Sequence, residues 1–410
     1  MTIPARHSRR RFLGSVAASS VASACIPAFL LHRSAVAAPV DVERSATESS
    51  ADLASAFMEA DSNPPRYRLT LGGRPSEALP GRAHGIAINA DRSMIVSFAR
   101  RPERWMQVYR RNHAGDYVLS HELNTPEDRH GMGHGVFSAD GARLYTTEND
   151  FGQSRGVIGV YDSVSFRRVG EIDSGGVGPH EIVLLPASAS TRPANSDIVC
   201  VANGGLETDP DFPRMILNEG QVESSLAFIE ITGRNGYTSA SLDSRVLGRH
   251  RLPESGSSLS IRHLAAVDSA TVCFGCQDQD QSSTSEFSDR LVGVATFRPD
   301  QAAAMQMLAP VPDASGYIGS VAYDVQSKTV LTSAPRGNTV AMWRIDKPHE
   351  APILHSINDA CGACVPAAQP GHFLVSTGFG ELWLLPANGS RPELIVSAAR
   401  RHYDNHMTMI

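Results

Sequence analysis

The stretch "GVFSADGARLYTTEND", residues 135–150, alternates apolar and polar residues on either side of an Asp-Gly turn. This period of two, interrupted by turn residues, is typical of two antiparallel strands joined by a hairpin. The pattern recurs in "SVAYDVQSKTVLTSAPRGNTVAMWRID" (320–346) and "AAQPGHFLVSTGFGELWLLPANG" (367–389), whereas helical periodicity is nearly absent. Repeating units of about 40 to 50 residues with about four strands are typical of β-propeller blades. The sequence therefore predicts an all-β protein built from repeated blades.

The innermost strand of each blade can be aligned by its first residues. Seven such starts follow one another along the chain, at His84, His134, His180, His263, Ser320, Gly362 and His406. They predict a seven-bladed β-propeller over residues 65–410. The last unit has room for a single C-terminal strand, so its outer strands must come from the N-terminal side, around "RYRLTLGG" at 66–73. Pairing the N- and C-terminal strands in one blade closes the ring and removes open sheet edges.

Histidine occupies five of these seven starts: His84, His134, His180, His263 and His406. Because the innermost strands of a propeller line its central channel, we expect the five side chains on one ring around the axis. Structural hydrogen bonding between blades is one interpretation, and a role toward an anionic substrate is another. Packing does not require the same residue type at five positions, however, and imidazole is the commonest ligand for Zn, Cu, Fe and Ni. We predict a metal or metal-bearing ligand in a His-lined axial funnel.

Polar residues are expected beside this ring, where they would orient the histidines or form a solvated rim. Some flank the aligned histidines in sequence, and others end second strands that should return to the same rim. The candidates are Arg82, Glu148, Asn149, Glu181, Asn203, Arg262 and Asp404. The carboxylates and amides among them could instead hold the metal of a propeller lactonase. Met132 and Met407 are soft candidate ligands for copper, although methionine in a strand more often belongs to the core.

Five cysteines lie beyond the first 37 residues: Cys200, Cys273, Cys276, Cys361 and Cys364. The "CFGC" motif lies in a predicted strand, where residues three apart face opposite sides, so its thiols cannot easily share one metal or one bond. The "CGAC" motif opens an inner strand and could provide a redox disulfide, a thiolate ligand or only small buried residues. The sequence leaves the disulfide pairing open.

The N-terminus predicts export. The motif "SRRRFLG", Ser8 to Gly14, contains Arg9 and Arg10 in the twin-arginine pattern, and a mildly apolar stretch and "AVA" (35–37) follow it. We predict a twin-arginine signal peptide over residues 1–37, a periplasmic protein, and no transmembrane segment after signal removal. Residues 38–64, rich in Ser, Ala, Asp and Glu, are interpreted as a flexible linker.

Charge and missing motifs narrow the classes of function. The formal net charge is −6, and the predicted leader contains arginines but no acidic residue, so the mature chain is more acidic still. This argues against nucleic acid and an anionic membrane surface as partners, and we expect a monomer. The chain has no phosphate loop and no C-x-x-C-H motif. Whether the protein is an enzyme is left open.

Several motifs together resemble the bacterial family called domain of unknown function 1513. They are "AHGIAIN" with "SFARRPERW", "TENDFGQSRGVIGVYD", "VANGGLETDPDFPR", "LSIRHLA" and the terminal "DNH", spread over about residues 80–410. The resemblance implies a twin-arginine-exported, seven-bladed propeller of the YVTN/WD40-like superfamily, with no established activity. Family members are commonly encoded near imelysin-like and di-haem oxidoreductase-like proteins, which implies iron or other metal handling. The family often has His where this chain has Asp209, so a ligand role for that loop position is not carried over.

Three functions are compatible with these features. The leading one is an accessory role in iron or copper acquisition or homeostasis, with periplasmic metal-uptake or redox proteins as partners. The second is a metal-dependent oxidoreductase. The third is a protein-interaction scaffold without metal. The sequence identifies neither the metal, Fe or Cu, nor a substrate.

Overall fold

The structure is a computed structural model that describes residues 52–187, 196–212, 215–233, 242–252, 258–280, 289–298, 304–397 and 400–410. The chain divides into two units, Met1–Val40 and Asp41–Ile410, and the whole first unit lies outside the described residues. The predicted signal peptide, with Arg9 and Arg10, therefore lies outside them too, as does the linker up to residue 51. No helix in the described part is long and apolar enough to cross a membrane.

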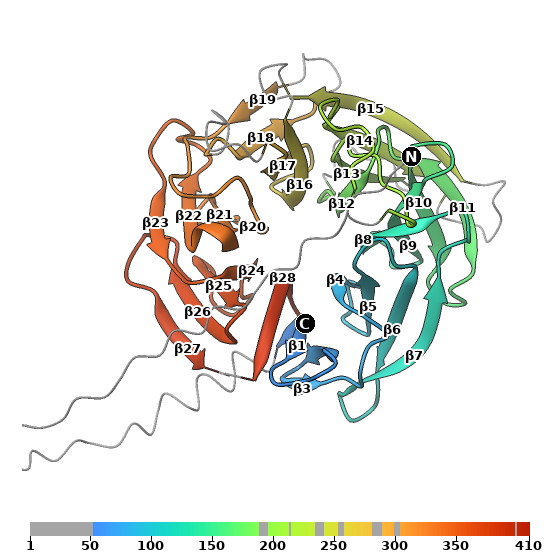
Figure 1. Ribbon diagram of the computed structural model, residues 1–410, viewed down its shortest axis with the longest axis horizontal. Coiled ribbons are helices and arrows are strands. Elements are labelled where there is room, and N and C mark those ends of the chain that lie inside the picture. Colours follow the sequence, from blue (N-terminus) through green and yellow to red (C-terminus); the bar gives the residue numbers. More distant parts are fainter. Residues whose placement is uncertain are drawn as a thin grey trace, which may run out of the picture. The chain divides into compact units, whose positions relative to one another are not determined.

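Seven four-stranded antiparallel blades surround a central axis (Figure 1). From the axis outward, the first blade consists of β4 (Ala83–Ile88), β5 (Met94–Ala99), β6 (Trp105–Arg111) and β7 (Tyr117–Asn124). The second consists of β8 (His130–Phe137), β9 (Arg143–Asp150), β10 (Arg155–Asp162) and β11 (Arg168–Asp173). The third consists of β12 (Pro179–Leu184), β13 (Ser196–Asn203), β14 (Ser225–Thr232) and β15 (Asp243–Arg251). The next three consist of β16 (Leu259–Ala266), β17 (Thr271–Asp278), β18 (Val292–Thr296) and β19 (Ala304–Met307); β20 (Ser320–Asp324), β21 (Thr329–Ala334), β22 (Thr339–Arg344) and β23 (Ile353–Ser356); and β24 (Ala360–Cys364), β25 (His372–Thr377), β26 (Glu381–Pro386) and β27 (Glu393–Ser397). One 3₁₀ turn, η3 (Pro335–Gly337), joins β21 to β22.

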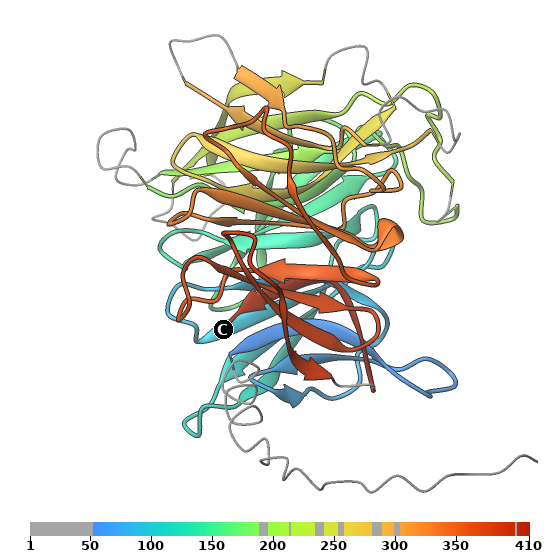
Figure 2. The same cartoon turned by 90° about the vertical axis from the view of Figure 1, so that its left-hand side faces the viewer.

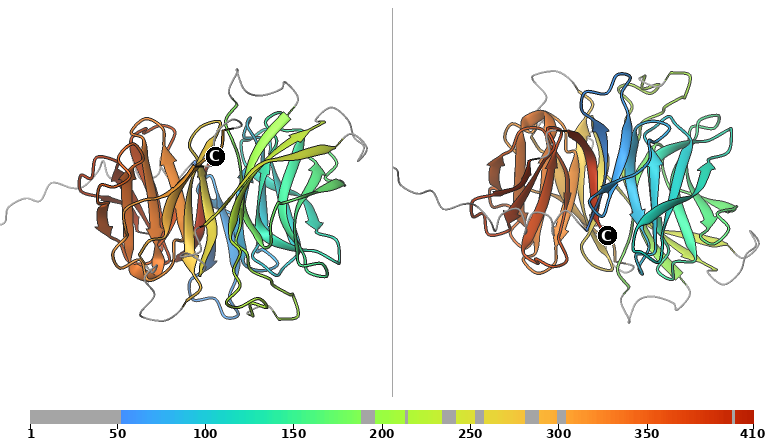
Figure 3. Two further views of the ribbon diagram at one scale, coloured as in Figure 1. Left: turned by 90° about the horizontal axis from the view of Figure 1, so that it is seen from above. Right: turned by 90° about the horizontal axis from the view of Figure 1, so that it is seen from below.

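The seventh blade joins the two ends of the described chain. Its strands, from the axis outward, are β28 (Arg401–Met409), β1 (Leu53–Glu59), β2 (Tyr67–Leu71) and β3 (Arg74–Pro75). Strand β1 pairs with β28 from Leu53 opposite Met409 to Glu59 opposite Arg401, and Figure 3 shows the N-terminal strands beside the C-terminal one. The prediction of a seven-bladed ring closed by its N- and C-terminal strands is confirmed.

The interpretation of residues 38–64 as a linker is wrong for Leu53–Glu59, which form β1. The segment "LASAFME" is short and lies within a stretch rich in Ser, Ala, Asp and Glu, yet Leu53 to Phe57 are buried. Leu53 and Phe57 pack in one cluster with Tyr403 of β28, while Ala54 packs in another with residues of β2 and of the first blade. The small residues suit a strand that is covered on both faces.

Burial changes from the axis to the rim of each blade. In the first blade, all six residues of β5 are buried, whereas β7 is exposed or half-buried throughout. Neighbouring blades cover both faces of the inner strands, as the side view in Figure 2 illustrates. A strand that is covered on both faces therefore has a continuous run of apolar residues, whereas an outer strand alternates apolar and polar residues. The core therefore lies between blades, and the channel wall consists of β4, β8, β12, β16, β20, β24 and β28.

Candidate metal centre

Five imidazole rings meet at the axis of the propeller. His84 lies on β4, His134 on β8, His180 on β12, His263 on β16 and His406 on β28, all innermost strands. The distances given by the structure between their ring centroids range from 4.5 to 6.5 Å. The structure thus brings together the five histidines that the sequence aligned, and these five are here called the histidine cluster.

Each histidine of the cluster lies at a β-bulge. The pairing of the inner strand with the next strand shifts register there, within 83–86 of β4, 131–135 of β8, 179–182 of β12, 261–263 of β16 and 403–407 of β28. A bulge bends its strand and redirects a side chain. Strand β20, which contributes no histidine, pairs in unbroken register. Strand β24 has a bulge without a histidine, so the bulge aims a side chain but does not determine its type.

Glycines beside the histidines allow the rings to approach one another. A Cβ atom on Gly85 would lie 2.5 Å from the carbonyl oxygen of Gly133 and 2.7 Å from Cδ2 of His134. Gly133 has φ +97°, and a Cβ there would lie 2.7 Å from Cδ2 of His84. Only glycine fits such positions without displacing a neighbour. The "HG" and "GHG" motifs of the sequence are therefore part of the packing of the cluster.

Two overlapping groups of atoms within the cluster are close enough to share a metal ion. One consists of His134, Glu181, His263 and His406, and the other of His84, His134 and His180; within each group the potential ligand atoms lie within 4.8 Å of one another. The Nε2 atoms of His134 and His406 are 3.1 Å apart. Ligand atoms about 2 Å from one ion lie at most about 4 Å from each other, so a small side-chain movement completes either group.

The cluster is neutral at pH 7. Burial lowers the pKa of His84 to about 4 and, with the nearby Arg262 charge, that of His263 to about 3. Burial and the neighbouring charges lower the pKa of His134, His180 and His406 well below the ordinary value. Neutral imidazole is the form that binds metals.

Several ring nitrogens of the cluster have no partner. Nδ1 of His84, Nδ1 of His134 and Nε2 of His263 are buried without a hydrogen bond among the described residues. A buried polar atom left in this way costs about 1–3 kcal/mol. A bound ion that accepts these nitrogens as ligands would remove part of that cost.

The predicted orienting residues contact the cluster directly. The Nδ1 atom of His180 lies 3.0 Å from the backbone oxygen of Arg262, and Nδ1 of His263 lies 3.3 Å from the Glu181 carboxylate. Burial raises the pKa of Glu181 to about 7, although the neighbouring His406 opposes this shift. Residue Thr147 of β9, which the sequence did not suggest, donates to the backbone oxygens of two cluster histidines, His134 and His180.

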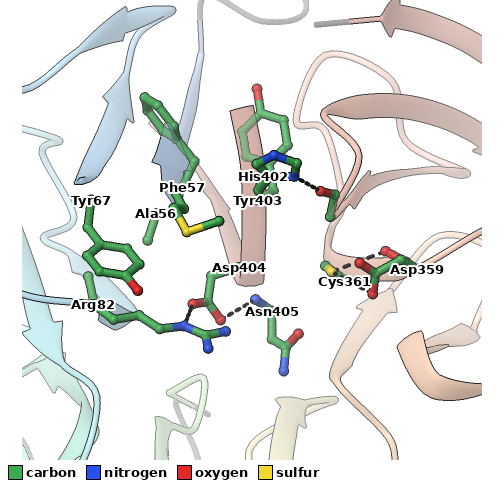
Figure 4. Close-up of a pocket in the computed structure, with 13 residues that line it drawn as sticks. Ala56, Phe57, Tyr67, Arg82, Asp359, Cys361, His402, Tyr403, Asp404 and Asn405 are labelled. Carbon is green, nitrogen blue, oxygen red and sulfur yellow. Dashed lines mark hydrogen bonds and ion pairs between the residues drawn. The ribbon is translucent and has the colours of Figure 1, made fainter. Parts of the chain in front are cut away.

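Asp404 lies between His84 of the cluster and Arg82, and Figure 4 shows its pairing with Arg82. Its carboxylate accepts a 2.5 Å hydrogen bond from Nε of Arg82 and lies 3.9 Å from Nδ1 of His84. Burial acts to raise the pKa of Asp404, but the hydrogen bond and charge of Arg82, together with the nearby His84, outweigh it and lower the pKa. Asp404 is thus ionised and holds Arg82 beside the cluster.

Three predicted rim residues lie elsewhere. Glu148 is fully buried inside its own blade, where it forms a 2.7 Å ion pair with Arg168. The amide of Asn149 donates to the backbone of Thr208, and that of Asn203 to the backbone of Ser174. The expectation that these three side chains reach the funnel rim is not met, because their partners come from blade strands and loops. The carboxylate and amide set of a lactonase metal is therefore not assembled by these residues.

Two cavities of about 350 Å³ each open on the histidine cluster from opposite ends of the channel. The arginine cavity lies at the start of the inner strands and is lined by Arg82, His84, Arg100, Arg101, Met132, His180, Arg262, Gln277, Tyr317, Arg336 and Asn405. The apolar cavity is lined by the later residues of these strands, among them Ile86, His134, Val136, Glu181, Val183, His406 and Met407. The cluster lies between the two cavities.

Sequence reasoning missed Arg100, Arg101 and Arg336. Arg100 and Arg101 directly follow β5, whose last residue Ala99 pairs with Ala83 at the start of β4. Arg336 lies in η3, directly after β21. The end of a second strand returns to the rim where the first strand begins, so this hairpin rule could have placed all three arginines beside the axis.

The cysteines and methionines have separate environments. All five described cysteines are free and buried, and burial raises their pKa values, that of Cys364 to about 12. Cys361 lines a pocket beside Asp359, shown in Figure 4. Met132 lines the arginine cavity and Met407 the apolar cavity. The thiols are protonated at neutral pH, which favours the interpretation as small buried residues.

Solved structures share the fold at low sequence identity. The Pseudomonas aeruginosa periplasmic gluconolactonase PpgL is 10% identical with a TM-score of 0.56, over 87% of this chain and 99% of that one. Hydrazine synthase from Kuenenia stuttgartiensis is 12% identical with a TM-score of 0.52, over 82% of this chain and 90% of that one. At such identities the similarity shows the propeller fold alone.

No curated protein matches the chain in sequence. The profile of a family described as "Protein of unknown function (DUF1513)" matches residues 77–410, which include every inner strand and the whole histidine cluster. The chain therefore belongs to the DUF1513 family, as its motifs predicted.

Proposed function

We propose that this protein binds a transition metal ion, iron or copper, through the histidine cluster, and that it serves as an accessory protein in periplasmic metal acquisition or homeostasis. The observation that carries the proposal is the convergence of five neutral imidazoles, four of them buried and that of His406 half-buried, with partnerless nitrogens among them. Metal-uptake or redox proteins of the same compartment are the proposed partners.

A purely structural role for the histidines explains the arrangement less well. A structural histidine is expected to bond to a neighbouring blade. In the described part, the Nδ1 atoms of His180 and His263 lie within hydrogen-bond distance of groups outside the cluster, and Nδ1 of His84 lies 3.9 Å from the Asp404 carboxylate. His250 provides a comparison, because it is buried and both its ring nitrogens lack partners. No group of potential metal ligands in the described part includes it, unlike the cluster. Ring nitrogens without partners therefore do not by themselves distinguish the cluster from His250. The close approach of several such rings does.

The residues present fit a transition metal. His134, His263 and His406 with Glu181 form an N₃O donor set, and His84, His134 and His180 form an N₃ set. Imidazole suits Cu, Fe and Zn, and one carboxylate among imidazoles is common for iron. A metal held there would act as a Lewis acid or electron carrier. The chain itself supplies neutral ligands, keeps them buried and orients His180 and His263 through their Nδ1 contacts.

A second candidate is a metal-dependent oxidoreductase. The arginine cavity opens directly on His84 and His180, and its volume lies in the range of small-molecule sites. A substrate held there would lie against the proposed metal. Turnover of a substrate by the metal-loaded protein would favour this candidate over the accessory role.

The metal proposal is tested by elemental analysis of protein purified from the periplasm. We expect close to one equivalent of iron or copper in the wild type and a loss of at least about tenfold in His134→Ala, because His134 belongs to both donor sets. His250→Ala is the matched control, since it also removes a buried histidine with partnerless nitrogens. Circular dichroism confirms that both variants are folded. Metal-free wild-type protein, or equal metal content in both variants, would contradict the proposal and favour a scaffold.

Periplasmic location is a separate part of the proposal. It is supported by the twin-arginine motif with Arg9 and Arg10. Replacing both by Lys should leave the precursor in the cytoplasm, as measured by cell fractionation. Normal periplasmic accumulation of that variant would remove the support.

A further inference from the structure

The arginine cavity concentrates positive charge at one end of the channel. Five arginines line it, and none of the other described residues that line it is an Asp or Glu: the arginines are Arg82, Arg100, Arg101, Arg262 and Arg336. We propose that this cavity is an anion-binding site for a small molecule with two or more carboxylate or phosphate groups. The site shares His84 and His180 with the histidine cluster, but none of its five arginines belongs to a group of potential metal ligands.

Four of these charges are not neutralised. Arg82 is paired with Asp404, whereas the described residues provide no ion pair for Arg100, Arg101, Arg262 or Arg336. Arg100 and Arg101 are adjacent in sequence, and all five arginines line one cavity of about 350 Å³, so their charges repel one another. Like charges held together in this way are destabilising unless a counter-ion joins them. A ligand of multiple negative charge matches this excess better than a monovalent anion.

Arg262 is the residue that most requires a partner. It is only 9% exposed, it lines the cavity, and its Nε atom is buried without a hydrogen bond. Its backbone oxygen lies 3.0 Å from Nδ1 of His180, and this contact fixes the position of the Arg262 backbone. An uncompensated buried charge is strongly unfavourable, and a bound oxyanion would supply the missing acceptor.

The other lining residues suit an oxyanion. Arginine presents a planar fork of donors that matches carboxylate and phosphate geometry. Tyr317 is held by a 2.6 Å hydrogen bond from Nδ2 of Asn405, and the guanidinium of Arg336 lies 5.1 Å from the centre of its ring. Gln277 adds an amide donor. Arginines therefore surround a polar floor, and the volume of about 350 Å³ admits a molecule of the size of a tricarboxylate.

The basic cavity is not a consequence of a basic protein. The whole chain carries a formal net charge of −6, so the positive charge of this cavity is opposite in sign to the net charge of the protein. A cleft lined by one sign of charge attracts counter-ions and raises their local concentration. This contrast favours a selective site over non-specific attraction of anions.

The proposal is tested by titration calorimetry at low ionic strength on mature protein that has been treated with a chelator. The probes are tricarballylate, pyrophosphate and, as a monovalent reference, acetate. We expect tricarballylate or pyrophosphate to bind with a Kd below about 1 mM, acetate to bind much more weakly, and added salt to weaken binding. Whichever of the first two probes binds more tightly shows whether the natural ligand is a carboxylate or a phosphate compound. Because no metal is present, the result is independent of the proposed metal function.

Arg262→Gln should weaken binding by at least about tenfold. The control is Arg391→Gln, which removes an exposed arginine outside the cavity. The unliganded Arg262→Gln protein should melt at the same or a higher temperature than the wild type, because a buried unpaired charge has been removed. A double variant, Arg100→Gln with Arg101→Gln, tests the same site through less buried side chains. Absence of binding to the wild type, or equal affinity of the wild type and both cavity variants, would overturn the proposal.

Discussion

The two cavities at either end of the channel have similar volumes but opposite character. The arginine cavity has five arginines in its wall, whereas the apolar cavity is lined mainly by strand residues such as Ile86, Val136 and Val183, with Glu181 as its acidic group. The same inner strands pass through both. Four of the five arginines lie at strand ends or in hairpin turns on one face, whereas Arg262 lies on β16 itself. Under the proposed function, the inner strands hold the metal, and the anion site is formed mainly by residues at the ends of strands on that face.

Removal of β28 should have the largest effect, because it destroys the channel that both cavities share. Deleting residues 403–410 removes His406, exposes the edge of β1 and uncovers the faces of β24 and β4 that pack against β28. We expect loss of cooperative unfolding, or a melting temperature lower by more than about 10 °C, measured by circular dichroism. A truncated protein that melts within a degree or two of the intact chain would show that the ring does not depend on this closure.

Low pH should lower the stability of the histidine cluster, which lies between the two cavities. The pKa of His84 is about 4 and that of His263 about 3 in the folded protein, below the ordinary value of 6.5. Between pH 6.5 and 4 the unfolded chain therefore binds more protons, and stability falls as the pH falls, by up to about 1.4 kcal/mol per pH unit for each histidine. Denaturant titrations of metal-free protein at several pH values measure this slope.

Glu181 contributes with the opposite sign. Its pKa is raised to about 7, so its contribution to stability is full below its ordinary value of 4.5 and is lost as the pH rises through 7. One carboxyl group offsets only part of the effect of five histidines. His84→Asn should reduce the slope. Stability that is constant between pH 7 and 5 would contradict neutral, buried imidazoles in the cluster.

Gly85→Ala should have an intermediate effect by forcing two cluster strands apart. The added methyl would lie 2.5 Å from the Gly133 carbonyl oxygen, and overpacking of this kind costs about 1–3 kcal/mol. We expect lower stability and lower metal content together. Gly152→Ala is the control, because the nearest atom to its Cβ is 3.8 Å away. Equal behaviour of the two variants would mean that close approach of the rings does not depend on Gly85.

The smallest effect is expected at the wall of one cavity only. Burial and the charge of Arg100 lower the pKa of Arg101, so Arg101→Gln should relieve repulsion and raise the free energy of unfolding by about 0.5 kcal/mol. Metal content should not change, because Arg101 belongs to the arginine cavity and not to a donor set. A loss of metal in this variant would show that the cavity and the cluster are not separate.

The repeated features of the molecule were predictable from the sequence, and its exceptions were not. Seven aligned strand starts predicted the blades, the ring closure and the convergence of the histidines, because equivalent positions in a propeller lie at the same height on the axis. Strand β1 was missed because "LASAFME" is a short segment within a stretch rich in Ser, Ala, Asp and Glu, and its burial depends on the blades that cover it.

The misplaced and missed site residues have a local cause. Neighbouring side chains on a strand point to opposite faces: on β9, Thr147 bonds to the cluster strands, whereas Glu148 turns into its own blade. The bulges in the inner strands change this alternation, and no short sequence pattern marks them. The arginines at the ends of β5 and β21 were predictable in principle, since the end of a second strand adjoins the start of the first.

The most direct test of the account is the position of the metal in a crystal of protein purified from the periplasm, located by anomalous scattering at the iron and copper absorption edges. The account predicts one anomalous peak on the propeller axis, about 2 Å from at least three ligand atoms of the histidine cluster and Glu181. The peak should be absent in His134→Ala crystals and present in His250→Ala crystals. A peak at any other position, or wild-type crystals without a peak, would contradict a metal centre at the histidine cluster.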